Sequence, residues 1–219
     1  MDSFMTVDVL LRWLHVLFGV TWIGILYYFN FIQGEYFKEA EASAKSDAVK
    51  KLAPRALWWF RWGAMFTFIT GVLLLLVVVR AHGIDGYLTI GVIMGTLMFL
   101  NVWLIIWPAQ KIVCGISEGD AAAAAPKALL ASRTNTLFSL PMLLGMLGSF
   151  HGTGQAADIV RHASGTGSVS MGLLIALLLI VALEVNAVVG KIGPMASVKG
   201  VIHCSVGLTV IFLMLLQFV

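Results

Sequence analysis

The chain has 219 residues, of which 60% are hydrophobic and only 11% are charged. Its mean hydropathy of +0.96 excludes a soluble globular domain and predicts an integral membrane protein. The formal net charge of +3 comes without an array of basic and aromatic residues, so the composition does not predict nucleic-acid binding. We expect the lipid bilayer to surround most of this chain.

Six apolar runs are long enough to cross a hydrocarbon core of ~30 Å. They lie at about 9–31, 57–79, 87–107, 134–151, 169–189 and 198–218. Arg12 and His15 interrupt the first run and no small-residue cleavage site follows it, so we expect this run to be retained and not removed as a signal peptide. The sequence therefore predicts an all-α fold, with residues 1–219 forming one transmembrane domain that is a bundle of six helices.

Basic residues are unevenly distributed among the segments that connect these runs. Most of them follow the first, third and fifth runs, whereas the opposite side carries few. Because cytoplasmic connections carry the excess of Lys and Arg, this pattern predicts that both termini face the outer side of the membrane. That side is the periplasm if the membrane is the inner membrane of a Gram-negative bacterium.

The connecting segments and two prolines carry further local predictions. Charges interleaved with alanines over residues 35–53 predict a surface helix on the cytoplasmic side. The run 121–125, followed by Pro126, predicts a short helix beside a break. Pro141 lies inside the fourth run, where it is expected to free a backbone carbonyl one turn earlier.

Ionisable and amide side chains within these runs fall into two layers on this topology. The outer layer contains Arg12, His15 and His151, and the inner layer contains Arg61, Asn101, Arg133, Asn135, Glu184 and His203. Such groups are expensive in a bilayer, so they require a functional reason or a partner. Both layers are therefore candidates for a functional site.

Histidine within a membrane bundle can bind haem iron or copper, transfer protons, or form a hydrogen bond that joins two helices. Copper favours closely spaced His and Met, whereas the ten Met residues here are scattered. The residues near the histidines favour haem b. Glycines leave room for a porphyrin, and arginines can pair with its propionates. Packing histidines explain the same pattern, because glycine is common at contacts between membrane helices. The residues alone leave both interpretations open.

Three blocks of the sequence resemble the membrane domain of the bacterial urate hydroxylase family, also called urate oxidase. They are Leu10–Val16 with Gly19 and Trp22–Gly24, then Trp58–Trp62 with Thr70 and Gly71, then Arg133–Thr136 with Ser139–Leu143 and His151. The blocks follow the family's order over most of residues 9–151. The first block taken alone is also similar to membrane proteins of the copper-resistance type and to the membrane-bound protoporphyrinogen oxidase.

The resemblance implies an inner-membrane helical domain that binds haem, oxidises urate to 5-hydroxyisourate and passes electrons to a fused cytochrome c domain. The sequence ends at Val219 and contains no Cys-x-x-Cys-His motif. A separate cytochrome c, or another partner in a respiratory complex, is therefore expected to accept the electrons.

Carried over by position, the resemblance assigns His15 and His151 as axial ligands of an outer haem b, with Arg12 near a propionate or an anionic substrate. Glu184 and His203 lie at matching depths, so they form either a second haem or proton-handling site or a hydrogen bond between two helices. The further candidates for contacts with the substrate or around the cofactor are Arg61, Arg133, Asn135 and Glu184.

Two functions of different classes fit these observations. One is a haem-containing membrane oxidoreductase of purine degradation that acts on urate. The other is a non-catalytic subunit that carries haem or supports a respiratory or electron-transfer complex. Retention of Arg12, His15, Arg133, Asn135 and His151 favours the oxidoreductase, and the absence of a cytochrome motif favours the subunit. We expect a haem-binding redox protein of the inner membrane.

Overall fold

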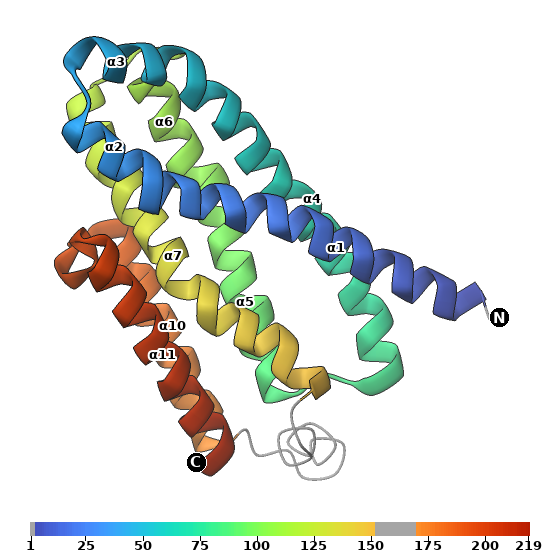
Figure 1. Cartoon of the computed structure of the whole chain (residues 1–219). Coiled ribbons are helices and arrows are strands. Elements are labelled where there is room, and N and C mark those ends of the chain that lie inside the picture. The colour runs from blue at the N-terminus through green and yellow to red at the C-terminus, as the bar shows by residue number, and fades with distance from the viewer. Residues whose placement is uncertain (1–2, 152–169) are drawn as a thin grey trace. The chain divides into compact units, whose positions relative to one another are not determined.

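The computed structural model of the protein describes residues 3–151 and 170–219, and within these ranges the regular elements are helices (Figure 1). The elements before residue 120 are α1 (Ser3–Tyr27), η1 (Tyr28–Gln33), α2 (Gly34–Glu39), α3 (Ala42–Asp47), η2 (Ala48–Leu52), α4 (Ala53–His82), α5 (Gly86–Leu100), η3 (Asn101–Ile106) and α6 (Trp107–Val113). The later ones are α7 (Ala121–His151), α10 (Met171–Val189), η4 (Gly193–Ala196) and α11 (Val198–Phe218). The described chain confirms the all-α prediction.

Five helical stretches of the described chain are long and apolar enough to cross a membrane. They are Thr6–Glu39, Ala42–Arg80, Gly86–Val113, Met171–Val189 and Val198–Phe218. The first three are longer than the predicted apolar runs because the helices continue into the connecting segments. The segment predicted as a surface helix is helical in two pieces, with a break at Ala40 and Glu41. These stretches support the predicted multi-pass membrane protein.

Helix α7 differs from the sequence prediction at its beginning. It is one helix of 31 residues, so the predicted break at Pro126 is wrong. Asp120 starts the helix, because its Oδ1 accepts hydrogen bonds of 2.9 and 3.2 Å from the N–H groups of Ala122 and Ala123. Pro126 leaves only the carbonyl of Ala122 without its usual partner, and Ala122 is exposed. Water can therefore satisfy that carbonyl, and the helix continues.

Pro141 frees a backbone carbonyl one turn earlier, as predicted. Proline has no N–H to offer the carbonyl of Leu137, which lies four residues earlier in α7. The hydroxyl of Ser205 on α11 donates a hydrogen bond of 2.8 Å to that carbonyl. A side chain from a second helix thus replaces the missing backbone partner, as a membrane interior requires.

The chain divides into two compact units. Unit 1 consists of Met1–Leu74 and Phe99–Thr136, and unit 2 consists of Leu75–Met98 and Leu137–Val219. The boundaries fall within α4, α5 and α7, so each of these three helices contributes residues to both units.

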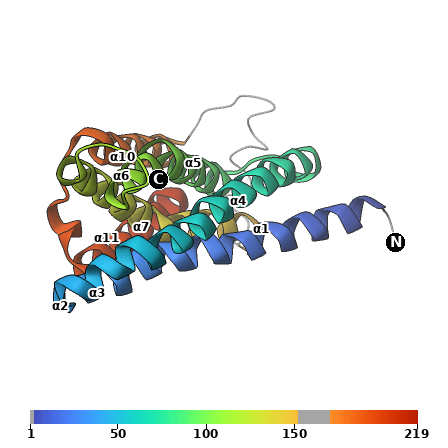
Figure 2. The ribbon, with the colours of Figure 1, turned by 90° about the horizontal axis from the view of Figure 1, so that it is seen from above.

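Aromatic rings fill the contact between α1 and the first part of α4 in unit 1, where the two helices run antiparallel (Figures 1 and 2). The ring centroids of Phe18 and Phe66 lie 5.0 Å apart, and those of Phe29 and Phe60 lie 5.7 Å apart. Gly63 permits this approach, because a Cβ atom there would lie 3.2 Å from the backbone nitrogen of Trp22. Close packing thus positions the polar residues of α1 against α4.

Three π-helical segments, η1, η2 and η3, occur in unit 1. A π turn shifts the side-chain register of a helix and is frequent at functional sites. Asn30 lies in η1 and Asn101 begins η3, with exposed fractions of 3% and 1%. Both widened turns therefore direct an amide into the interior of unit 1.

Unit 2 packs through glycines. A Cβ atom at Gly145 of α7 would lie 2.6 Å from the carbonyl oxygen of Tyr87 and 2.7 Å from the nitrogen of Gly91, both on α5. The side chain of Gln217 on α11 donates a hydrogen bond of 2.9 Å to the hydroxyl of Tyr87. Direct backbone approach at small residues is typical of helix association in membranes.

Candidate functional site

His15 lies on the side of α1 that packs against α4. Its Nδ1 is 3.0 Å from the carbonyl oxygen of Thr67 and 3.3 Å from the hydroxyl of Thr70. The imidazole edge rests against Gly71, where a Cβ atom would lie 2.9 Å from its Cε1. Two threonines and a glycine of α4 thus fix the position of this ring.

These contacts decide which ring nitrogen of a neutral His15 carries the proton. The carbonyl of Thr67 can only accept, so Nδ1 is the donor. The hydroxyl of Thr70 has its own acceptor in the carbonyl of Phe66 at 2.6 Å, which leaves its oxygen available to Nδ1. The lone pair of the ring is then on Nε2. Histidines that ligate metals are commonly oriented by such a bond from the second ring nitrogen to a backbone carbonyl, so His15 fits a haem ligand.

Arg12 lies one turn away from His15 and is already engaged. Its Nε donates a hydrogen bond of 2.9 Å to Oδ2 of Asp8, within an ion pair whose side chains are 34% and 24% exposed. Oδ1 of Asp8 is buried without a hydrogen-bond partner. The guanidinium that the sequence suggested for a propionate or a substrate therefore sits beside a carboxylate.

Buried amides join α7 to η1 and η3. Nδ2 of Asn101 donates a hydrogen bond of 3.0 Å to Oδ1 of Asn135, and Asn135 itself is 0% exposed. Nδ2 of Asn30 donates to the hydroxyl of Ser132 at 2.8 Å. These bonds hold α7 in register on both sides of residue 133.

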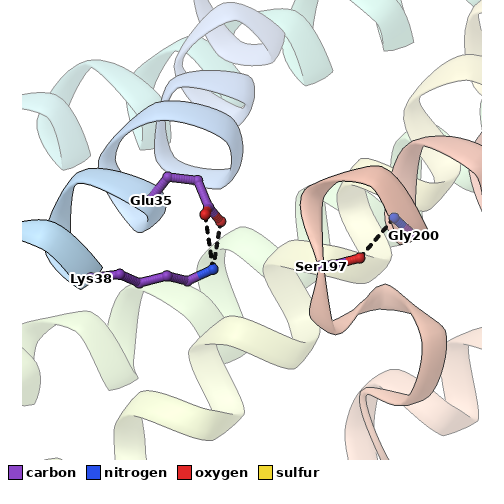
Figure 3. A network of polar contacts seen from close by, with 4 residues as sticks. All are labelled: Glu35, Lys38, Ser197 and Gly200. Carbon is purple, nitrogen blue, oxygen red and sulfur yellow. Dashed lines mark hydrogen bonds and ion pairs between the residues drawn. The ribbon is translucent and has the colours of Figure 1, made fainter.

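Arg133 lies between these two anchoring points on α7 and is only 4% exposed. Its Nε and Nη1 are buried and have no hydrogen-bond partner. Glu35 acts electrostatically on this guanidinium. The same carboxylate, however, accepts hydrogen bonds of 2.7 and 2.9 Å from Lys38 (Figure 3). Arg133 thus carries a buried positive charge whose Nε and Nη1 donors are not used by the protein.

Arg61 of α4 stacks on an indole. Its Cζ atom lies 3.8 Å from the ring centroid of Trp107, and its Nε is buried without a partner. The neighbouring Trp62 packs edge-on against Trp103, with ring centroids 5.9 Å apart. The indole N–H groups of Trp103 and Trp22 are also buried without partners. A cation held on an aromatic face keeps its edge free to bind an anion.

Unit 1 thus holds more buried donors than acceptors. We define its donor-rich layer as Trp22, Arg61, Trp103 and Arg133. These four side chains contribute unpartnered N–H groups, whereas the unpartnered acceptors of unit 1 are Oδ1 of Asp8 and Oε1 of Gln33. Such groups are expensive in an apolar interior, and an anion that accepts their hydrogen bonds would offset that penalty. The donor-rich layer is therefore the strongest candidate for a binding site in the described chain.

Glu184 and His203, the candidates of unit 2, do not belong to the donor-rich layer. Glu184 lines an open apolar groove formed by Leu97 and valines of α10. His203 occupies an exposed position on α11. The proposed pairing of these two residues stays a prediction. The side chain of His151, at the end of α7, lies outside the described part of the chain. Among the described residues, no group of three or more His, Cys, Asp or Glu side chains could hold a metal ion.

One part of the chain is similar to a known protein family. The sequence matches the family described as urate oxidase N-terminal over residues 80–178. This confirms the family resemblance predicted from the sequence. No curated protein and no solved structure matches the chain.

The urate oxidase N-terminal match covers part of the candidate site. It includes Asn101, Arg133 and Asn135, together with the block that ends at His151. The two earlier blocks of the resemblance, which contain His15 and Arg61, precede the matched residues. Arg133, Asn101 and Asn135 therefore lie within the matched residues, whereas Asn30 precedes them.

Sequence reasoning missed several members of the site. The sequence does not single out the indole N–H groups of Trp22 and Trp103, which are buried in unit 1. The bond between Asn30 and Ser132 joins residues 102 positions apart, so local patterns do not reveal it. An available signal was Asn30 itself, because an amide within an apolar run requires a partner.

Proposed function

We propose that this protein is a haem-binding redox protein of the bacterial inner membrane that oxidises urate to 5-hydroxyisourate. The reaction adds water to urate and releases two electrons and two protons, and a separate cytochrome c would accept the electrons. The observation that carries the proposal is the guanidinium of Arg133, 4% exposed and with two unpartnered donor nitrogens, inside the urate oxidase N-terminal segment.

The donor-rich layer supports urate as its ligand. Urate at neutral pH is a planar anion whose carbonyl oxygens accept hydrogen bonds. Arg133 would supply the charge and two N–H groups, and the indole N–H groups of Trp22 and Trp103 would bind further oxygens. Stacking of Arg61 on Trp107 holds a second guanidinium ready beside this set. In this role the side chains bind and orient the anion and exclude water.

Haem b would be held by His15 and by His151, with Arg12 near its propionates and His203 as a possible ligand of a second haem. When bound, the haem would supply one-electron transfer. His15 keeps Nε2 available because Thr67 accepts the proton of Nδ1. Arg61 and Thr67 are six residues apart on α4, which corresponds to about 9 Å along the helix axis. The two parts of unit 1 are thus close enough to act on one reaction.

The proposal includes the full topology predicted from the sequence. Helix α7 would be a sixth membrane-spanning helix, and both termini would face the periplasm. The distribution of basic residues supports this orientation. The buried polar residues of α7 account for its lower apolarity, because a helix with polar side chains can cross a membrane when protein surrounds them.

Optical spectra of the detergent-purified protein, oxidised and dithionite-reduced, test the haem. We expect Soret and α bands that are lost in His15→Ala and retained in His203→Ala. Bands that survive in His15→Ala and disappear in His203→Ala would contradict the assignment of His15. No bands in protein produced with adequate haem would overturn the haem proposal altogether.

Urate consumption in the presence of a soluble electron acceptor then separates an enzyme from a haem carrier. We expect 5-hydroxyisourate to form in proportion to the acceptor reduced. A haem-loaded protein that neither binds nor oxidises urate would instead be the non-catalytic subunit of an electron-transfer complex.

A further inference from the structure

A pocket of about 400 Å³ in unit 1 lies where α3 and η2 meet the end of α6. It is lined by Ala42, Lys45, Ser46, Val49, Lys50, Val113, Cys114 and Gly115. Residues 42, 45, 46, 49 and 50 recur at helical spacing and form one stripe along α3 and η2. None of these residues takes part in the proposed haem or urate site.

The pocket is positively charged. Lys45 and Lys50 line it together with the hydroxyl of Ser46, and no lining residue is a carboxylate. In the described parts of the chain, neither lysine forms an ion pair. The adjacent Lys51 is different, because Asp47 pairs with it. Two cations beside a hydroxyl favour a ligand that carries a phosphate or another anionic group.

The pocket also lies beside the ends of two candidate membrane-spanning stretches. One candidate membrane span begins at Ala42, and another ends at Val113, and both residues line the pocket. Val49 adds a further apolar side chain to the same wall. A ligand with an anionic head and an apolar body matches this division, whereas a soluble anion would use only the lysines.

The end of α6 offers little opposition to an anion. The N–H groups of Ile116 and Ser117 both donate to the carbonyl of Lys111, at 2.8 and 3.2 Å, and that of Gly115 donates to Ile112 at 3.0 Å. These bonds satisfy carbonyls that would otherwise present the negative end of the helix dipole.

We propose that this pocket binds the headgroup of an anionic phospholipid. Lys45 and Lys50 contact the phosphate, Ser46 donates a hydrogen bond to it, and an acyl chain follows the wall formed by Val49 and Val113. Such a lipid fastens the helical segment 42–52 to α6 at the membrane surface. This site does not depend on the function proposed for the donor-rich layer.

Cys114 provides a probe because it lines the pocket. We would measure its alkylation by N-ethylmaleimide in delipidated, detergent-purified protein, with peptide mass spectrometry to separate Cys114 from Cys204. Burial raises the pKa of the Cys114 thiol, so the reaction is run at about pH 8.5 to obtain enough thiolate. We expect phosphatidylglycerol to slow the alkylation of Cys114 several-fold and phosphatidylcholine to leave it unchanged.

Lysine variants test whether the protection of Cys114 depends on Lys45 and Lys50. In Lys45→Gln/Lys50→Gln, we expect about 30-fold more phosphatidylglycerol to be needed for the same protection, since each lysine contributes about fivefold. Lys191→Gln/Lys199→Gln removes two charges elsewhere and should behave as the parent protein. Lys45→Arg/Lys50→Arg should retain protection, and an unchanged alkylation rate without lipid indicates that a variant is folded.

Three outcomes would overturn the proposal. They are equal protection by phosphatidylcholine, equal protection by inorganic phosphate, and unchanged protection in the folded Lys45→Gln/Lys50→Gln protein. Protection by inorganic phosphate alone would assign the pocket to a soluble anion.

Discussion

The two units of this protein differ in the groups that they bury. Unit 1 encloses amides, indoles and arginines, and several of their donors have no partner, as at Arg133. Unit 2 brings backbones together at Gly145 and meets the carbonyl freed by Pro141 with the hydroxyl of Ser205. Close contact at small residues stabilises helices in a membrane without unmet polar groups. The unmet donors of unit 1 therefore indicate where a ligand belongs.

Removal of the buried cation should have the largest effect. Because Arg133 is proposed to bind the anion, we expect Arg133→Met to lower the kcat/KM for urate at least ~100-fold, or about 3 kcal/mol. Stability should be unchanged or higher, because the substitution removes a buried charge without partners. Urate turnover and thermal unfolding measure the two effects. Arg80→Met, at an exposed position of α4, is the matched control. A strongly destabilised Arg133→Met with normal turnover would show that this arginine is structural.

Packing in unit 2 should respond to a single methyl group. A Cβ atom at Gly145 would lie 2.6 Å from a backbone oxygen, so we expect Gly145→Ala to lower the free energy of unfolding by about 2 kcal/mol. Gly207→Ala on α11 is the control, since no atom lies within 4 Å of the added Cβ. Thermal melting in detergent compares them. Equal melting temperatures for the two variants would contradict the close approach of α5 and α7.

The setting of His15 can be disturbed without changing the histidine. A Cβ atom at Gly71 would lie 2.9 Å from Cε1 of His15, so we expect Gly71→Ala to shift or weaken the haem bands. Gly24→Ala adds the same methyl where no atom lies within 4 Å and should leave the spectrum intact. Reduced-minus-oxidised spectra at matched protein concentration provide the comparison. Identical spectra for Gly71→Ala and the parent protein would remove His15 from the haem site.

The smallest effect concerns the hydrogen bond of Ser205. Loss of its hydroxyl leaves the carbonyl of Leu137 without a donor, so Ser205→Ala should destabilise the protein by about 1 kcal/mol. In the Pro141→Ala background the restored N–H can bond this carbonyl, and the same substitution should then have little effect. A double-mutant cycle by thermal unfolding tests this. Additive effects of the two substitutions would contradict the idea that the Ser205 hydroxyl replaces the N–H missing at Pro141.

The sequence and the structure contributed differently to the site. Apolar runs predicted the membrane helices, because hydropathy over about 20 residues depends only on neighbouring positions. The sequence also singled out Arg61, Arg133 and Asn135 as polar residues that needed a reason. It misjudged Pro126, because whether a proline ends a helix depends on where that helix begins. It could not reveal that the indole N–H groups are unpartnered, since this depends on whether the fold places a hydrogen-bond acceptor near them.

By itself the sequence determined the helical membrane class, the family resemblance and the ionisable residues within the apolar runs, all of which follow from residue types along a short stretch. Only the tertiary structure decided that His15 meets Thr67, 52 positions away, and that Asn101 meets Asn135, 34 positions away. It also decided that Arg133 keeps unused donors in a buried place. Hydrogen-bond satisfaction is a property of the packed interior, because a donor is paired or unpaired only once every neighbouring helix has taken its position.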